Sequence, residues 1–127
     1  EKETGWFTYS ELAEQLIPYV KELGFNAVAY MPSRNTLPQL ERLMKLCKDN
    51  DLFQISGEDI NSPRQAFVND KIKEEPFQHL ITATWTLIGH EKQATENIDN
   101  GMFTETTMKN YPSIEERIEY FSECGKR

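Results

Sequence analysis

The chain has 127 residues, a length that suits one ordinary domain. Its 21 acidic and 14 basic side chains give a net charge of −7. This balance argues against nucleic acid or an anionic membrane as a partner, because either would require a basic face. No apolar run has the length of a membrane span, and we expect a cytoplasmic protein. Because the sequence starts at Glu1 rather than Met, we expect 1–127 to be a single domain or the C-terminal fragment of a larger one.

The first predicted element is a helix that starts near Thr8, where Thr8 and Glu11 form a capping box. Gly24 is expected to end it, and Pro18 is expected to kink it or weaken one turn. Helical spacing predicts one apolar face for this helix. That face comprises Leu12, Leu16, Tyr19, Val20 and Leu23.

Two short apolar runs follow, over 27–31 and 52–55, and their length and composition favour buried strands. Between them, a capping box at Thr36 starts a helix that runs to about Asn50 and places Cys47 in the core. Strand, helix and strand in this order indicate a parallel βαβ unit.

Two parallel strands are not a stable sheet alone. We therefore expect the remainder of a parent chain, or a partner in a homo-oligomer, to complete the sheet.

The second half of the chain is predicted to be helical. A short helix should start at Ser62, and a charged connector over 71–75 should follow it. A long helix is expected from Pro76 to a stop at Asn100 and Gly101, and a last helix from Ser113. The fold class is therefore α/β, helix-rich, with two short parallel strands.

Polar residues that could carry chemistry follow both predicted strands. If the strands are adjacent and parallel, the loops 32–35 and 56–61 lie at one edge, where the sites of α/β folds are found. Asp59 offers carboxylate oxygen to a divalent metal, and Arg34 can bind a phosphate through two hydrogen bonds. The alternative is that these are ordinary turn residues. His79 and His90 are too far apart on a helix to share a metal ion.

The segment from Glu22 to Gln65 resembles the late part of a PHP domain, the polymerase and histidinol phosphatase family. The family's Gly-Ser-Asp-x-His loop corresponds here to Gly57-Glu58-Asp59-Ile60-Asn61. The resemblance implies a distorted (β/α)7 barrel, of which this chain would be a fragment, with a metal cluster at the carboxyl ends of its strands. It also implies a metal-dependent phosphoesterase that acts on a small-molecule phosphate ester.

The resemblance gives metal-ligand positions to two residues, and three more have expected roles from their place in the two loops. Asp59 matches the family's late Asp ligand, so it would hold a zinc, manganese or iron ion and act in catalysis. Asn61 stands where the family usually has His, which weakens that metal position. Arg34, Asn35 and Glu58 would bind the substrate. The family's other ligands do not lie in these 127 residues, so the isolated chain is not expected to assemble a competent metal cluster or to be active.

Two other functions remain open. Asn61 in place of His favours a degenerate PHP-like module that binds a phosphorylated or acidic ligand without catalysis. Alternatively, the chain is a helical protein-interaction domain that uses Trp6, Phe7, Trp85 or Phe103 at a partner surface, although core packing is the simpler role for such aromatic residues.

Overall fold

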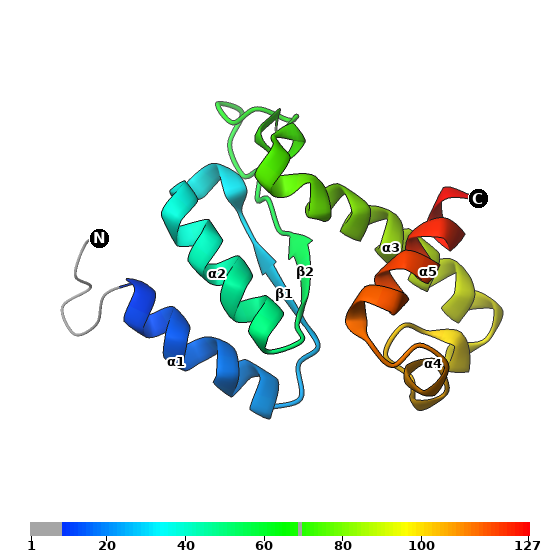
Figure 1. Cartoon of the computed structure of the whole chain (residues 1–127). Coiled ribbons are helices and arrows are strands. Elements are labelled where there is room, and N and C mark those ends of the chain that lie inside the picture. Colours follow the sequence, from blue (N-terminus) through cyan, green and yellow to red (C-terminus); the bar gives the residue numbers. More distant parts are fainter. Residues whose placement is uncertain (1–8, 69) are drawn as a thin grey trace. The chain divides into compact units, whose positions relative to one another are not determined.

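A computed structural model describes residues 9–68 and 70–127, with side chains from Leu12 onward. These residues belong to two compact units, 1–69 and 70–127, and each is described here by itself. The chain is helix-rich with two short parallel strands, as predicted (Figure 1). Among the described residues, no helix is both long and apolar enough to cross a bilayer.

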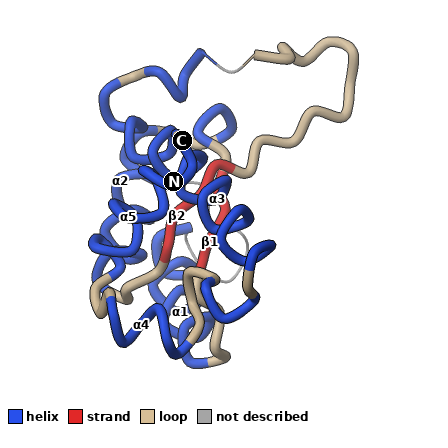
Figure 2. Tube along the Cα trace, turned by 90° about the vertical axis from the view of Figure 1, so that its right-hand side faces the viewer, coloured by secondary structure: helices blue, strands red, loops and turns tan. Residues whose placement is uncertain are grey.

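The first unit contains the predicted βαβ arrangement. Helix α1 (Tyr9–Glu22) precedes strand β1 (Ala27–Tyr30), helix α2 (Leu37–Asp49) and strand β2 (Phe53–Ser56). The two strands run parallel and side by side, with Ala27 opposite Phe53 and Tyr30 opposite Ser56 (Figure 2). A single turn of 3₁₀ helix over Pro32–Arg34 connects β1 to α2. The carboxyl ends of both strands therefore lie at one edge of the sheet.

Helix α2 starts where the sequence predicts. The Thr36 hydroxyl accepts a hydrogen bond from the Gln39 N–H, and the Gln39 side chain accepts one from the Thr36 N–H, which completes the capping box. Leu40, Leu43 and Cys47 are buried, so the prediction that Cys47 is a core residue is confirmed. The strands are less buried than predicted, because Ala29 in β1 is exposed.

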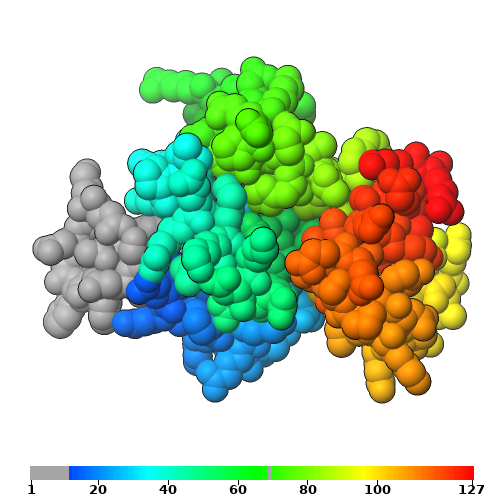
Figure 3. All heavy atoms as spheres, viewed as in Figure 1, coloured from blue at the N-terminus to red at the C-terminus, as the bar shows by residue number. Residues whose placement is uncertain are grey.

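The predicted apolar face of α1 is wrong. Ala13 and Ile17 are the buried residues of this helix, and an ion pair between Glu14 and Arg42 joins α1 to α2. Four of the five residues of the predicted face are exposed, on and just after α1, which is drawn in blue in Figure 3: Leu12, Leu16, Tyr19 and Leu23. The predicted helix start at Thr8 lies outside the described residues. Gly24 ends α1 with a φ of 93°, as predicted.

No helix starts at Ser62. Residues 62–68 form turns and bends, and one hydrogen bond from the Gln65 N–H to the Ser62 carbonyl closes a single turn. The reason lies in the side chain of Gln65, the third residue of the predicted helix. It bonds instead to the backbone of the preceding loop, at Asp59 and Asn61.

The second unit is helical. Short 3₁₀ turns over Asp70–Lys73 and Glu75–Phe77 replace the predicted connector and lead into α3 (Gln78–Glu96). A further 3₁₀ turn (Ile98–Asn100), helix α4 (Glu105–Asn110) and helix α5 (Ile114–Lys126) follow. Helix α3 packs along α5. The core of this unit is formed by Phe77, Leu80, Met102 and Phe121, each fully buried.

Candidate functional site

The candidate site is the rim formed by the loops that follow β1 and β2. The N–H of Gly57 donates to the carbonyl of Tyr30 at 2.9 Å and extends the parallel pairing into the rim. A Cβ on Gly57 would lie 2.9 Å from the Cβ of Ala29, so the second loop can approach β1 this closely only with glycine at position 57. The topology therefore brings the two polar loops together, as the sequence predicts.

Glu58 is held by a residue that the sequence analysis did not select. Its carboxylate accepts hydrogen bonds from the Ser33 N–H, at 3.0 Å, and from the Ser33 hydroxyl, at 2.5 Å. Hydrogen bonds to a carboxylate are among the stronger ones. Ser33 therefore connects the first loop to the second, and the Glu58 carboxylate contributes to this connection.

Arg34 and Asp59 meet across the rim, but through the main chain of Asp59. A terminal nitrogen of Arg34 donates to the Asp59 carbonyl oxygen at 2.9 Å. The side-chain amide of Gln65 donates to the same oxygen at 3.0 Å. One oxygen of the Asp59 carboxylate accepts from the Asn61 side-chain amide at 3.2 Å. The carboxylate of Asp59 is otherwise at the surface, since the residue is exposed.

The remaining predicted residue of the rim, Asn35, bonds within its own loop. Its side-chain amide donates to the Met31 carbonyl at 2.9 Å and so stabilises the turn that precedes α2. Beneath the rim, the Tyr30 hydroxyl donates to the Gln54 side chain at 2.9 Å. Burial, followed by the charge of Cys47, raises the pKa of Tyr30 far above its usual range. Tyr30 is therefore a neutral support for the site.

The oxygen atoms of this rim suit a hard divalent cation only in part. Asp59 offers an exposed carboxylate, the ligand that magnesium, manganese and calcium prefer. The side-chain NH₂ of Asn61 points toward Asp59 and orients its carboxylate in this conformation. The side-chain amide of Asn61 would have to flip before its oxygen could bind the same ion. Within the described ranges, no group of three or more His, Cys, Asp or Glu side chains could hold a metal ion.

The two histidines lie in the second unit. Burial lowers the pKa of His79, and a hydrogen bond with the Pro76 backbone opposes this. The Nδ1 atom of His90 accepts from the Met102 N–H at 2.9 Å and its ring lies edge-on to Phe121. His90 therefore fixes the chain after α3.

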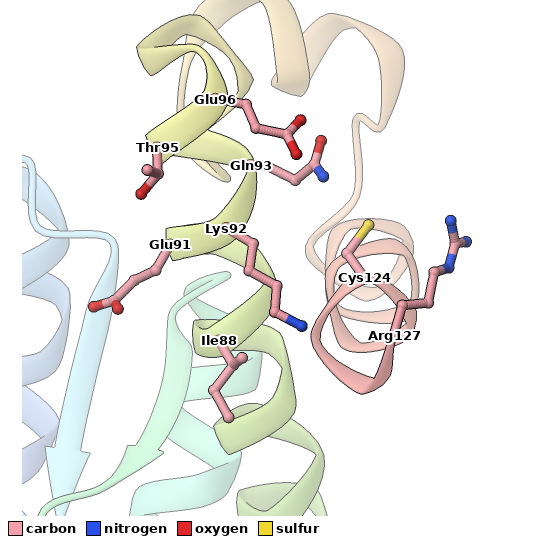
Figure 4. Close-up of a pocket in the computed structure, with 8 residues that line it drawn as sticks. All are labelled: Ile88, Glu91, Lys92, Gln93, Thr95, Glu96, Cys124 and Arg127. Atoms are coloured by element: carbon pink, nitrogen blue, oxygen red, sulfur yellow. The ribbon is translucent and has the colours of Figure 1, made fainter.

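The second unit also has an open hollow of about 650 Å³ beside the ends of α3 and α5. Figure 4 shows that its side chains point in different directions: Lys92 toward α5, Glu91 and Thr95 away from it. The Lys92 ammonium donates to the Gly125 carbonyl at 3.1 Å, and this contact connects the two helices. The lining residues therefore do not converge on a common point.

The aromatic residues proposed for a partner surface have different environments. Trp6 and Phe7 lie outside the described residues. Trp85 is 40% exposed, and Phe103 lies beneath the guanidinium of the buried Arg117, 5.7 Å from the ring centroid. Trp85 is thus exposed, whereas Phe103 is half-buried.

In comparisons with known proteins, no family model matches this sequence and no solved structure matches the chain.

Proposed function

We propose that this chain forms the late part of a PHP-like metal-dependent phosphoesterase site, with Asp59 as a ligand of a divalent metal ion. One observation supports it above the others: Arg34, in the loop after β1, reaches across the rim to the Asp59 carbonyl in the loop after the neighbouring parallel strand. A cation and a carboxylate at one sheet edge suit a phosphate ester together with its metal. The sheet would then belong to a (β/α) barrel. Its other strands and metal ligands would come from a part of the polypeptide outside these 127 residues.

Three residues of the rim, Asp59, Asn61 and Arg34, have roles in this proposal. A bound divalent ion would polarise a phosphoryl oxygen and lower the pKa of bound water. Asp59 holds the ion through its exposed carboxylate oxygen, and Asn61 orients that carboxylate. Arg34 has five N–H donors, of which the hydrogen bond to Asp59 uses one, and the others bind the substrate's phosphate. Manganese is favoured over zinc, because the side chains offer only oxygen.

A second function is favoured by the orientation of Asn61. Its amide donates to Asp59, whereas a His in that place would offer the family's imidazole ligand. A PHP-like module with a weakened metal position would bind a phosphorylated or acidic ligand through Arg34 without turnover.

The substitution Asp59→Ala tests the first proposal. In the full-length polypeptide that carries this chain, we expect manganese-dependent hydrolysis of 4-nitrophenyl phosphate to fall about a hundredfold or more, because a metal's charge stabilisation is worth several kcal/mol. Bound metal per protein, measured by mass spectrometry, should fall with it.

Asp49→Ala is the matched control, because Asp49 is an exposed aspartate on α2 that pairs with Lys45 at 2.7 Å. It should leave both the hydrolysis and the metal content unchanged. Equal turnover in the Asp59→Ala variant and the unmodified protein would remove Asp59 from the mechanism. Ligand binding without any turnover in the unmodified protein would favour the second function.

A further inference from the structure

Gln65 uses both ends of its side-chain amide on the backbone of the loop that carries Asp59. Its Nε2 donates to the Asp59 carbonyl at 3.0 Å, and its Oε1 accepts from the Asn61 N–H at 2.8 Å. One partner is an acceptor and the other a donor, so the amide satisfies both in one orientation only. The Gln65 N–H in turn donates to the Ser62 carbonyl at 3.0 Å, which closes the turn that positions the side chain.

The Asp59 carbonyl is consequently held from two sides. Arg34 approaches it from the first loop at 2.9 Å, and Gln65 approaches it from further along the second loop. A carbonyl oxygen has two lone pairs, so these two donors satisfy it and fix the peptide plane after Asp59. The side chain of Asp59 is attached to this fixed backbone, and its carboxylate is oriented by Asn61.

We infer that Gln65 is a positioning residue, which holds the loop 59–61 so that the Asp59 carboxylate is set in place before a divalent cation arrives. Gln65 does not contact the cation itself. This inference rests on the proposed role of Asp59 as a metal ligand. Residues that orient a ligand in this way typically account for a factor of about 10 to 100 in metal affinity.

The test uses the variant Gln65→Met in the full-length polypeptide that carries this chain, with Mn²⁺ as the probe, because the isolated chain is not expected to assemble the metal site. Methionine has nearly the length of glutamine and is uncharged, so it removes both hydrogen bonds without adding charge beside the cation. We expect the Mn²⁺ dissociation constant, measured from paramagnetic broadening of the Asp59 and Asn61 amide signals, to rise about tenfold. Hydrogen exchange of the Asn61 amide should accelerate by a similar factor.

Gln78→Met is the matched control. The Gln78 side chain also donates to a backbone carbonyl, that of Lys73 at 2.6 Å, but it lies in the second unit. It should leave the Mn²⁺ affinity and the Asn61 exchange rate unchanged. A second variant, Gln65→Ala, removes the same two hydrogen bonds with a smaller side chain and should shift both measurements in the same direction as Gln65→Met.

The outcomes separate this inference from the proposal beneath it. An equal Mn²⁺ affinity in the Gln65→Met variant and the unmodified chain overturns the inference alone. Mn²⁺ that binds the unmodified chain without broadening the Asp59 signals overturns the proposed metal site and the inference with it. A rise in the dissociation constant that the control does not share supports both.

Discussion

The interior of the first unit contains two weak acids, Tyr30 and Cys47, and their burial favours the neutral form of each. Burial raises the pKa of Cys47 from 9.0 to about 11, and it also raises the pKa of Tyr30. An unfolded chain therefore releases the Cys47 proton at lower pH than the folded one. The stability that comes from this difference is fully present below pH 9 and is lost as the pH rises from about 9 to 11.

We predict that Cys47→Ala makes the alkaline loss of stability shallower. In the unmodified chain, Cys47 should lower the free energy of unfolding by up to about 1.4 kcal/mol per pH unit between pH 9 and 11. The alanine variant loses packing at every pH, because Cys47 is fully buried, but it has no thiol to titrate. Urea unfolding at pH 7, 9 and 10.5 measures this, with the pH 7 difference as the reference. Parallel curves for the two proteins would contradict the prediction.

At the level of single residues, the sequence predicted which side chains share the rim but not the atoms through which they meet. The strand order suffices to bring Arg34 near Asp59. The path of each loop decides that Arg34 binds a carbonyl and that Ser33 holds Glu58. Nothing in the sequence marks Ser33 as more than a turn residue. The sequence placed Gln65 in the first turn of a predicted helix, and only its contacts with Asp59 and Asn61 reveal its actual use.

Among the elements, α3 and α5 approach each other closely at two glycines. A Cβ on Gly89 would lie 1.8 Å from the Phe121 carbonyl oxygen, and a Cβ on Gly125 would lie 2.0 Å from that of Trp85. The hydroxyl of Thr86, a fully buried residue of α3, lies 2.9 Å from the Thr82 carbonyl of its own helix and 3.3 Å from the Ile118 carbonyl of α5, so its one proton is shared between them. The small residues let the backbones meet, and this contact determines how the two helices pack.

We predict that Gly89→Ala destabilises the chain by about 3 kcal/mol or more, because the added methyl group meets backbone that cannot yield without separating the helices. Alanine normally stabilises a helix relative to glycine by about 0.5–1 kcal/mol. A decrease in the free energy of unfolding on Gly89→Ala would therefore be diagnostic of the close helix contact. Urea unfolding followed by circular dichroism measures the change, and Gly125→Ala should behave alike. The control is Ala94→Gly on the same helix, which should cost only the ordinary propensity difference. A stabilised Gly89→Ala variant would show that the helices do not meet here.

Helix α1 shows why periodicity alone did not identify the buried face of an element. Apolar residues occur around much of this helix, so the spacing fits a stripe through Leu12 and Leu16 as well as one through Ala13 and Ile17. Contact with α2 selects the second stripe. In α2, Leu40, Leu43 and Cys47 are buried, whereas Leu37 at the start of the helix is exposed.

For the whole molecule, the alternation of helices and short apolar runs was sufficient to predict the α/β class and the parallel pair. It could not reveal what completes the sheet. In the described part of the chain, β1 and β2 pair only with each other, so each strand has one open edge. A parallel pair of this size is not stable on its own, and the proposed barrel or a second copy of the chain would supply further strands.

Hydrogen exchange can report such a completion. In a parallel pair, alternate N–H groups of a strand point to its partner. Phe53 and Gly57 donate to the Asn26 and Tyr30 carbonyls, so by this alternation the Ile55 amide also faces β1, whereas the amides of Gln54 and Ser56 point away from it. In the 127-residue chain at low concentration, we predict that the Gln54 amide exchanges faster than those of Phe53 and Gly57. Protection of Gln54 that appears as the concentration of the chain rises would identify a second copy as the added strand. Protection that appears only in a longer polypeptide would support the barrel, and a Gln54 amide already protected in the dilute chain would contradict an open edge.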